Sequence, residues 1–413
     1  IDRFKPGSQA EIDTFQSTYG PCDTLNGDLD IAGLGDVTNL DGLEGLETVK
    51  GYLRLLNNPQ LIDTRGLFFL REVSGAFIID SNPLLEEFFG GNLATVGALI
   101  LSNNASMYRF TGLNNLTTAG EITITDNPAM WSLNGLYELR VVERIALVRN
   151  PLIRHLEDLG NLAATGYLTI MEMDGLTNLR GLWSLTTAHS IYIASNQNLA
   201  SVEGLRNVVV TRYIHIESNP ALEHLFGLAN FLSSPPDLPR IILINNGSLQ
   251  RIDTFENLVA ANQINIRGNS SLQDLDDFPS LTRIVGSLSV EGNTALESIP
   301  GMDQLEFVGE SVRIMDNPSL ATCHGLLKAL DYLDDGEPGP GPGPAGIPDV
   351  GGDVLMGNNL AGCNSVSDLL ADFPLDHINA GMSDAWYDPD TSGQGFQIMV
   401  FPIIRQIFLT WFT

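Results

Sequence analysis

Asparagine is the side chain with the most regular spacing in this chain, and its amide can both donate and accept hydrogen bonds. It ends a motif of the form apolar-x-apolar-x-x-Asn, which repeats in steps of 22 to 24 residues with one step of 27. Met173 stands at the one position of this series where Asn is missing. We predict a structural ladder in which the amides of successive repeats stack and satisfy buried turn carbonyls. Its members are Asn58, Asn82, Asn104, Asn127, Asn150, Asn196, Asn219, Asn246, Asn269, Asn293 and Asn317.

Other residues that could do chemistry give weaker signals. The six histidines lack metal-ligand spacing such as His-Glu-x-x-His, and no Gly-x-Ser-x-Gly motif marks a nucleophile. The segment Asp388–Gly393 resembles the first half of a calcium loop, but the twelfth position is Met399 instead of a bidentate Glu. A tight turn accounts for it better. We therefore expect no catalytic residues, no bound metal, no cofactor and no enzymatic activity.

A period this regular predicts a solenoid, in which each repeat is one coil that packs on its neighbours. Segments such as Ile122–Asn127 and Ile214–Asn219 carry two apolar residues at period two, which marks a short strand. Asn-Pro then ends the strand. We predict a mainly β fold, a right-handed solenoid of parallel strands with about 13–14 coils of ~23 residues. The longest step contains Ser233–Asp237, an insertion expected to form a loop.

Both ends of such an array need caps, because the terminal coils would otherwise expose core side chains. At the front, Ser8–Glu11 fits a capping box that opens an amphipathic helix to about Tyr19. At the back, Cys323–Leu333 is typical of a helix, and a Pro/Gly-rich loop and a last strand over Asp353–Asn359 follow. The predicted domains are a helical N-terminal cap (1–28), the solenoid (29–320), a C-terminal cap with the Pro/Gly loop (321–372) and a partial β module (373–413).

The chain has three cysteines. We expect a disulfide between Cys323 and Cys363, which would clamp the C-terminal cap around the flexible loop. Cys22 is left over, and it would pair with a cysteine removed upstream, cross-link two chains, or stay a buried thiol. A disulfide indicates an oxidising compartment.

Composition excludes several classes of partner. The 413 residues include 21 Lys and Arg against 50 Asp and Glu, which gives a formal charge of −29. Nucleic acid and anionic membrane surfaces need clustered cations, so neither is expected. No apolar run reaches the ~18 residues that a membrane span needs. Because the chain begins at Ile1, we interpret it as a mature form without its signal peptide, secreted or held at the cell surface.

The solvent face of the predicted sheet is the most informative surface. Its first outward column is expected to be Asp30, Arg54, Ile78, Ile100, Thr123, Ala146, Thr169, Tyr192, His215, Ile242, Asn265, Ser289 and Arg313. The second is expected to be Ala32, Leu56, Asp80, Ser102, Thr125, Val148, Met171, Ala194, Glu217, Ile244, Arg267, Glu291 and Met315. This mixture does not fit the monotonous Thr ladder of an ice-binding solenoid. Varied columns favour recognition of an irregular partner, and exposed aliphatics at Ile78, Ile100, Ile242 and Ile244 suggest a covered face. The predicted ligand-binding residues are Thr169, Tyr192, His215, Glu217, Ile242 and Arg267.

The segment Cys22–Ile31, followed by these coils, resembles the opening of receptor L domains, the β-helical ligand-binding domains of the insulin and EGF receptor families. The resemblance covers about residues 8–372 and implies an extracellular, non-catalytic scaffold. The chain differs from the animal receptors in its longer uninterrupted array and in lacking their Cys-rich modules and kinase, so their hormone ligands do not carry over. The tail, Gly381–Phe396 and Phe408–Thr413, is similar to the start of a small β module of secreted Gram-negative bacterial proteins, and we expect a short hairpin there.

Two functions follow as hypotheses. In the first, the chain is a bacterial binding or adhesion protein whose sheet face holds a glycan or a protein at the cell surface. In the second, it is a structural subunit that assembles with copies of itself into an extracellular fibre or surface layer. Unpaired Cys22 and an aromatic tail able to add strands to a neighbour favour the second.

Overall fold

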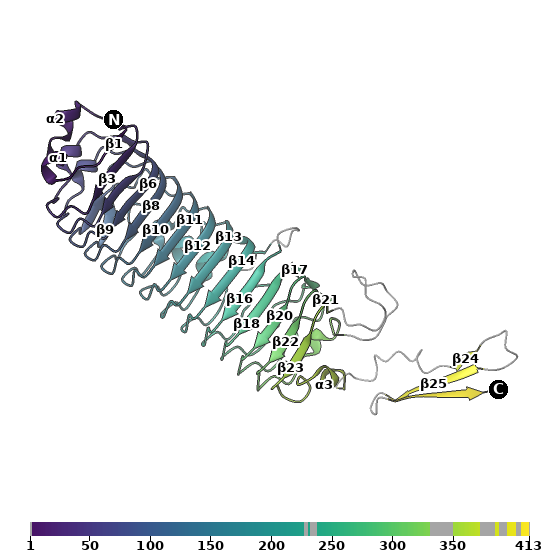
Figure 1. The fold of residues 1–413 in the computed structure, drawn as a ribbon. Coiled ribbons are helices and arrows are strands. Elements are labelled where there is room, and N and C mark those ends of the chain that lie inside the picture. Colours follow the sequence, from purple (N-terminus) through teal and green to yellow (C-terminus); the bar gives the residue numbers. More distant parts are fainter. Residues whose placement is uncertain are drawn as a thin grey trace.

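The computed structural model describes residues 2–226, 230–231, 238–330, 350–371, 385–387, 395–401 and 406–412. Its main body is a parallel β-solenoid of about 13 turns with ~23 residues in each turn, which confirms the fold predicted from the Asn period. Figure 1 shows the strands stacked along an elongated body, from α1 (Gln9–Asp13) and α2 (Phe15–Tyr19) at one end to β23 (Val354–Gly357) at the other.

One long parallel sheet forms a side of the solenoid, and its strands pair in register. Ile122 lies beside Ile145, and Ile145 lies beside Leu168, so equivalent positions of the repeat form straight columns. The strands are β1 (Arg3–Phe4), β3 (Asp28–Ala32), β5 (Leu53–Leu56), β6 (Glu72–Asp80), β8 (Thr95–Ser102), β10 (Thr118–Thr125), β11 (Val141–Val148), β12 (Ala164–Met171), β13 (Thr187–Ala194), β14 (Val209–Glu217), β16 (Arg240–Ile244), β18 (Gln263–Arg267), β20 (Leu288–Glu291), β22 (Val312–Met315) and β23.

Short elements form the other sides of each coil. Strands β2 (Thr24–Leu25), β4 (Thr48–Val49) and β15 (Asn230–Phe231) also belong to the main sheet. Two smaller parallel sheets are β7 (Glu87–Phe89) with β9 (Arg109–Thr111), and β17 (Ala260–Ala261) with β19 (Arg283–Ile284) and β21 (Phe307–Val308). Turns of 3-10 helix lie at η1 (Asp41–Leu43), η2 (Arg65–Leu67), η3 (Glu157–Leu159), η4 (Arg180–Leu182), η5 (Glu203–Leu205) and η6 (His324–Leu326).

Inward-facing aliphatic side chains stack into one continuous core. Within one coil, Ile122, Ile124, Met130, Leu133 and Leu136 are all fully buried. The same positions of the other coils join them in a single cluster that runs the length of the solenoid. Burial of each such side chain stabilises the fold by about 1.5–3 kcal/mol. Because these side chains are buried against the neighbouring coils, every coil depends on the two beside it for its stability.

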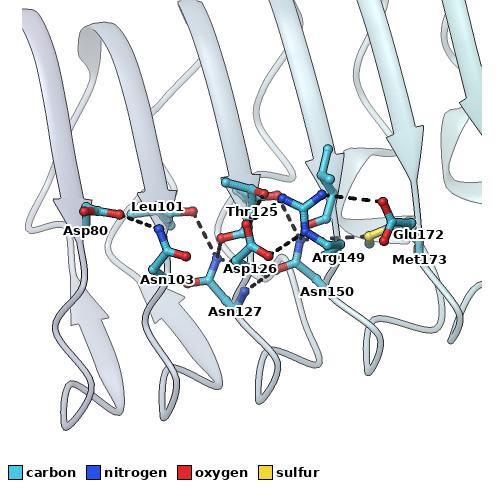
Figure 2. Close-up of polar contacts among 12 residues, drawn as sticks. Asp80, Leu101, Asn103, Thr125, Asp126, Asn127, Arg149, Asn150, Glu172 and Met173 are labelled. Carbon is cyan, nitrogen blue, oxygen red and sulfur yellow. Dashed lines mark hydrogen bonds and ion pairs between the residues drawn. The ribbon is translucent and has the colours of Figure 1, made fainter.

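The predicted Asn side chains form a buried ladder along the ends of the sheet strands. In a typical rung, Asn127 Nδ2 donates to the carbonyl oxygens of Leu101 (3.0 Å), in the coil before, and of Thr125 (2.9 Å), in its own strand. The backbone N–H of Asn127 donates to Asn150 Oδ1 in the coil after, at 3.1 Å (Figure 2). All eleven predicted members are fully buried. Each amide therefore ties three successive coils together.

Two positions depart from the predicted ladder. Met173 is fully buried with its Sδ 3.9 Å from Asn150 Nδ2, and its own N–H donates to Asn196 Oδ1 at 2.9 Å, so this coil is repacked around an apolar side chain. Asn359 adds a final rung that the period did not reveal, because it follows Asn317 by 42 residues. Its Oδ1 accepts from the N–H of Asn317 at 3.0 Å, and its Nδ2 donates to the Cys363 carbonyl at 2.8 Å.

The N-terminal segment folds as two short helices instead of one. Ser8 Oγ accepts from the N–H of Glu11 at 3.4 Å, and Glu11 Oε2 accepts from the N–H of Gly7 at 2.9 Å. The helix breaks at Thr14, which separates α1 from α2. Ile12 and Phe15 are buried in the first part of the core.

The helix predicted over Cys323–Leu333 is wrong in its described part. η6 lies there, the same 3-10 turn that earlier coils form. The cause is that the repeat continues: Leu326 fills a core position, and Gly325 packs so closely that an added Cβ would lie 2.4 Å from the Ile299 carbonyl oxygen. A short helix, α3 (Val366–Ala371), follows β23.

Cys323 and Cys363 form a disulfide with their Cα atoms 5.7 Å apart. It joins the last regular coil to the segment that follows β23. Cys22 has a free, half-buried thiol whose Sγ lies 3.4 Å from the Thr24 carbonyl oxygen.

The C-terminal part contains three antiparallel strands where two were expected. They are β24 (Ala385–Tyr387), β25 (Gly395–Phe401) and β26 (Gln406–Phe412), paired in that order. The insertion Ser233–Asp237, the Pro/Gly loop Pro338–Pro344 and the turn Asp388–Gly393 lie outside the described residues.

Replacing a rung of the ladder should destabilise the solenoid. The Asn219→Ala variant would orphan the buried N–H of Asn196 and the buried carbonyl of Ile193, which bond Asn219 at 3.1 Å each. At about 1–3 kcal/mol for each orphaned group, we expect a loss of about 2–6 kcal/mol in the free energy of unfolding, measured by urea denaturation. Asn198→Ala is the control and should lower the free energy of unfolding far less, because Asn198 is exposed and its Nδ2 donates only to the Asp174 carbonyl among the described residues.

Candidate functional site

The register of the main sheet aligns the residues of both predicted outward columns in neighbouring rows, but Asp30, Ser102 and Ala194 within these rows are buried. Four of the predicted binding residues lie on successive strands at one position, and these are Thr169, Tyr192, His215 and Ile242. Glu217 lies two residues beyond His215 on β14, and Arg267 lies two coils further along the second column. The structure therefore brings Tyr192, His215 and Glu217 together, while Arg267 is exposed at a distance from them.

A third outward column was missed, because strands β6 to β14 begin earlier than the short motif indicates. It runs through Ala76, Ala98, Glu121, Arg144, Tyr167, Ser190, Tyr213, Arg240 and Gln263. The alternation Tyr213-x-His215-x-Glu217 was the available signal, since residues two apart in a strand share a face.

Tyr192, Tyr213, His215 and Glu217 form a polar aromatic cluster at the middle of the sheet face. The Tyr213 hydroxyl lies 2.8 Å from His215 Nδ1 in a hydrogen bond. His215 Nε2 lies 2.9 Å from Glu217 Oε2, at ion-pair distance but without the alignment of a hydrogen bond. The Tyr192 ring meets the imidazole edge-on, with ring centroids 4.9 Å apart. These contacts fix the rotamers of the cluster and present ring faces and polar groups on one surface.

Burial keeps the His215 imidazole and the two tyrosine hydroxyls of the cluster in their neutral forms. It lowers the pKa of His215, an effect that Glu217 partly offsets, so the imidazole is neutral at physiological pH. Burial, with a smaller contribution from Glu217, raises the pKa of Tyr192. Burial likewise raises the pKa of Tyr213. Both phenols therefore stay protonated, which suits hydrogen bonding to a ligand more than nucleophilic chemistry.

The aliphatic residues of the face are less exposed than expected. Each of the four is half-buried, namely Ile78, Ile100, Ile242 and Ile244. They do not amount to a bare apolar patch.

A hollow lies along the edge of the sheet where the strands begin. An added Cβ at Gly120 would lie 2.4 Å from the Gly97 carbonyl oxygen, so successive coils pack closely there. At this same position of the repeat, one coil carries Glu143 and another carries His189, and both side chains are exposed. A hollow of 610 Å³ is bordered by Gly120, Glu143, His189 and the exposed ring of Tyr167.

A second hollow, the strand-end groove, lies along the opposite edge of the same coils. It has a volume of 720 Å³ and is lined by Asn103, Asp126, Arg149, Glu172, Asp174 and Gln197, among others. Arg149 Nε and Nη2 donate to the two carboxylate oxygens of Asp126 at 2.6 and 2.7 Å, and Nη1 lies 3.5 Å from Glu172 Oε1 (Figure 2). This bidentate contact lowers the pKa of Asp126 and raises that of Arg149, so both remain charged.

An acidic hollow of 410 Å³ contains Asp253, Glu256, Asp276 and Asp277. Asp277 is buried; its Oδ1 accepts from the N–H of Asp253, and its Oδ2 has no partner among the described residues. Burial first, and then the charge of Asp276, raises the pKa of Asp277 to about 7.

Within the described ranges, no group of three or more His, Cys, Asp or Glu side chains is arranged to hold a metal ion. In the same part of the chain, no helix has the length and apolar character to cross a membrane. Comparison with protein-family models and with curated proteins gave no match to this chain.

The buried Asp277 should make stability fall as pH rises. Its folded-state pKa of about 7 exceeds the ~3.9 of an unfolded Asp, so between these values the folded chain binds more protons than the unfolded chain. This stabilising contribution is present in full below pH ~4 and is lost as pH rises through ~7. We expect Asp277→Asn to be more stable than the wild type at pH 8 and to gain little at pH 5, measured as urea midpoints. Asp303→Asn, at an exposed site, should gain at neither pH.

Proposed function

We propose that this chain is an extracellular, non-catalytic binding scaffold that holds a glycan or a protein on the solvent face of its main sheet. The observation that carries the proposal is the cluster of Tyr192, Tyr213, His215 and Glu217, locked together by contacts of 2.8 and 2.9 Å. Ring faces next to neutral donors and acceptors are the usual means of recognising sugar rings or peptide groups.

The position of the cluster supports the same role. It lies in mid-solenoid on strands β13 and β14, and the hollows on both edges of the sheet extend over the neighbouring coils. A rigid sheet with fixed side chains loses little conformational entropy on binding. The Cys323–Cys363 disulfide supports an extracellular setting, since such bonds persist in oxidising compartments. The resemblance of residues 8–372 to receptor L domains points the same way.

Truncating the cluster should weaken binding without unfolding the chain. We expect Tyr192→Ala and His215→Ala each to raise the Kd at least about tenfold for a ligand found on a glycan array or a cell-surface protein panel, since central anchors contribute about 2 kcal/mol or more. The measurement is surface plasmon resonance, with circular dichroism to verify folding.

Ile100→Ala is the matched control, because it lies in the same outward column several coils away. Equal losses of affinity in the control and in the cluster variants would contradict the assignment of the site.

Self-assembly is a second candidate, favoured by the end of the sheet. Among the described strands β23 pairs only with β22, and Leu355 on β23 is 42% exposed. An edge of this kind can accept a strand from another copy. The charge of −29 opposes association.

Light scattering after size exclusion, with and without reductant, tests self-assembly. Polymers would support self-assembly, and a ~45 kDa monomer in both conditions would contradict it.

A further inference from the structure

We propose that the strand-end groove is a binding subsite for a neutral oligosaccharide chain that runs along the solenoid axis. The inference rests on the proposed binding function, but it concerns a different edge of the sheet. It depends on three departures from the repeat that coincide in neighbouring coils.

The first departure is in the backbone. The residue before each ladder position adopts a left-handed conformation, with φ between 51° and 68° at thirteen sites. Eleven of these sites carry Asn, Asp, Ser or Gly, short residues suited to this conformation. The two exceptions are Arg149 and Glu172, and both line the groove. Long side chains are thus kept where the backbone disfavours them.

The second departure is the gap in the ladder. Met173 directly follows Glu172 and replaces the Asn amide that every other described rung from Asn58 to Asn359 provides. Asn150 Nδ2 meets a thioether 3.9 Å away in place of an amide oxygen.

The third departure follows one residue later, where Asp174 stands at a turn position that carries Pro128 and Pro151 in the two preceding coils. Concentrated violations of local rules mark functional surfaces more often than chance packing.

The polar groups of the groove match hydroxyl groups. The contacts to Asp126 and Glu172 use three of the five N–H groups of Arg149, which leaves two without a partner among the described residues. The carboxylates of Asp126, Glu172 and Asp174 keep spare lone pairs. Donors and acceptors thus alternate along one line (Figure 2). A sugar hydroxyl both donates and accepts, so it can satisfy either kind of group.

The charges of the groove argue against other small ligands. Three carboxylates against one guanidinium leave an excess of negative charge, which repels anions. The Arg149 side chain is 45% exposed at the centre of the groove, and its guanidinium repels cations and offers only donors. The left-handed residues from Asn103 to Ser195 span four coil spacings, about 19 Å, which is long enough for several sugar units in an extended chain.

Arg149→Asn tests the inference, because Asn suits the left-handed backbone while it removes the guanidinium. The full chain is titrated by calorimetry with hexameric gluco-, manno-, galacto- and N-acetylglucosamine oligosaccharides, and with oligogalacturonate and hexalysine as charged probes. We expect at least one neutral hexamer to bind, Arg149→Asn to raise its Kd about tenfold or more, and the melting temperature of this variant to equal or exceed that of the wild type. Ser218→Asn, in the same left-handed row but outside the groove, should bind as the wild type does.

Other outcomes overturn the inference. Unchanged affinity in Arg149→Asn, preference for a charged probe, or no binding of any neutral hexamer would each do so. Unchanged affinity in Arg149→Asn together with a loss in Tyr192→Ala would leave the proposed sheet-face function standing and remove only the groove. Unchanged affinity in Tyr192→Ala together with a loss in Arg149→Asn would instead move the binding function from the sheet face to the groove.

Discussion

A buried amide that bonds to the coil before it and the coil after it is the constraint on which this structure depends. Each ladder Asn accepts a backbone N–H and donates to a carbonyl of the coil before it. Asn127 Oδ1 accepts from the N–H of Asn104, and its Nδ2 donates to the carbonyls of Leu101 and Thr125. The Asn amide presents two donor hydrogens and an acceptor oxygen in one planar group. The amide therefore sets how far each coil advances and where each strand ends.

The regular outer face is a consequence of that ladder. Because strand ends are fixed, residues at the same place in the repeat line up, as Tyr192 and His215 do on β13 and β14. A variable position then becomes a column of side chains, and neighbouring columns become a patterned surface. Recognition on such a surface needs no pocket in the core, only a change of residue type at solvent-facing positions.

The departures from the repeat cluster in the middle of the molecule. Glu143 and His189 stand at a corner position that carries Gly120 and Gly166 in alternate coils, and Arg149 stands in the left-handed row. The aromatic cluster adjoins these coils on the sheet face. We propose that these exceptions on the surface serve the binding function.

Much of this could be predicted from the sequence, for reasons visible in particular residues. The Asn period predicted the solenoid, and the period-two apolar pairs predicted which residues such as Tyr192 face outward. Tyr213 was missed because the strands begin before the repeated motif, although its alternation with His215 and Glu217 along β14 was an available signal. The left-handed row was missed because its sequence signal, a short polar residue before Asn, is obscured at Arg149. The helix expected after Cys323 failed because Leu326 and Gly325 continue the repeat, and tertiary packing overrides helix propensity.

Hydrogen–deuterium exchange with mass spectrometry, on the full chain with and without the tightest-binding oligosaccharide or surface protein, tests the central claim most directly. The account predicts new protection confined to the strands and strand ends within residues 103–217, with the rest of the solenoid unchanged. Protection that appears only at the terminal coils, or that is spread evenly along the solenoid, would contradict it.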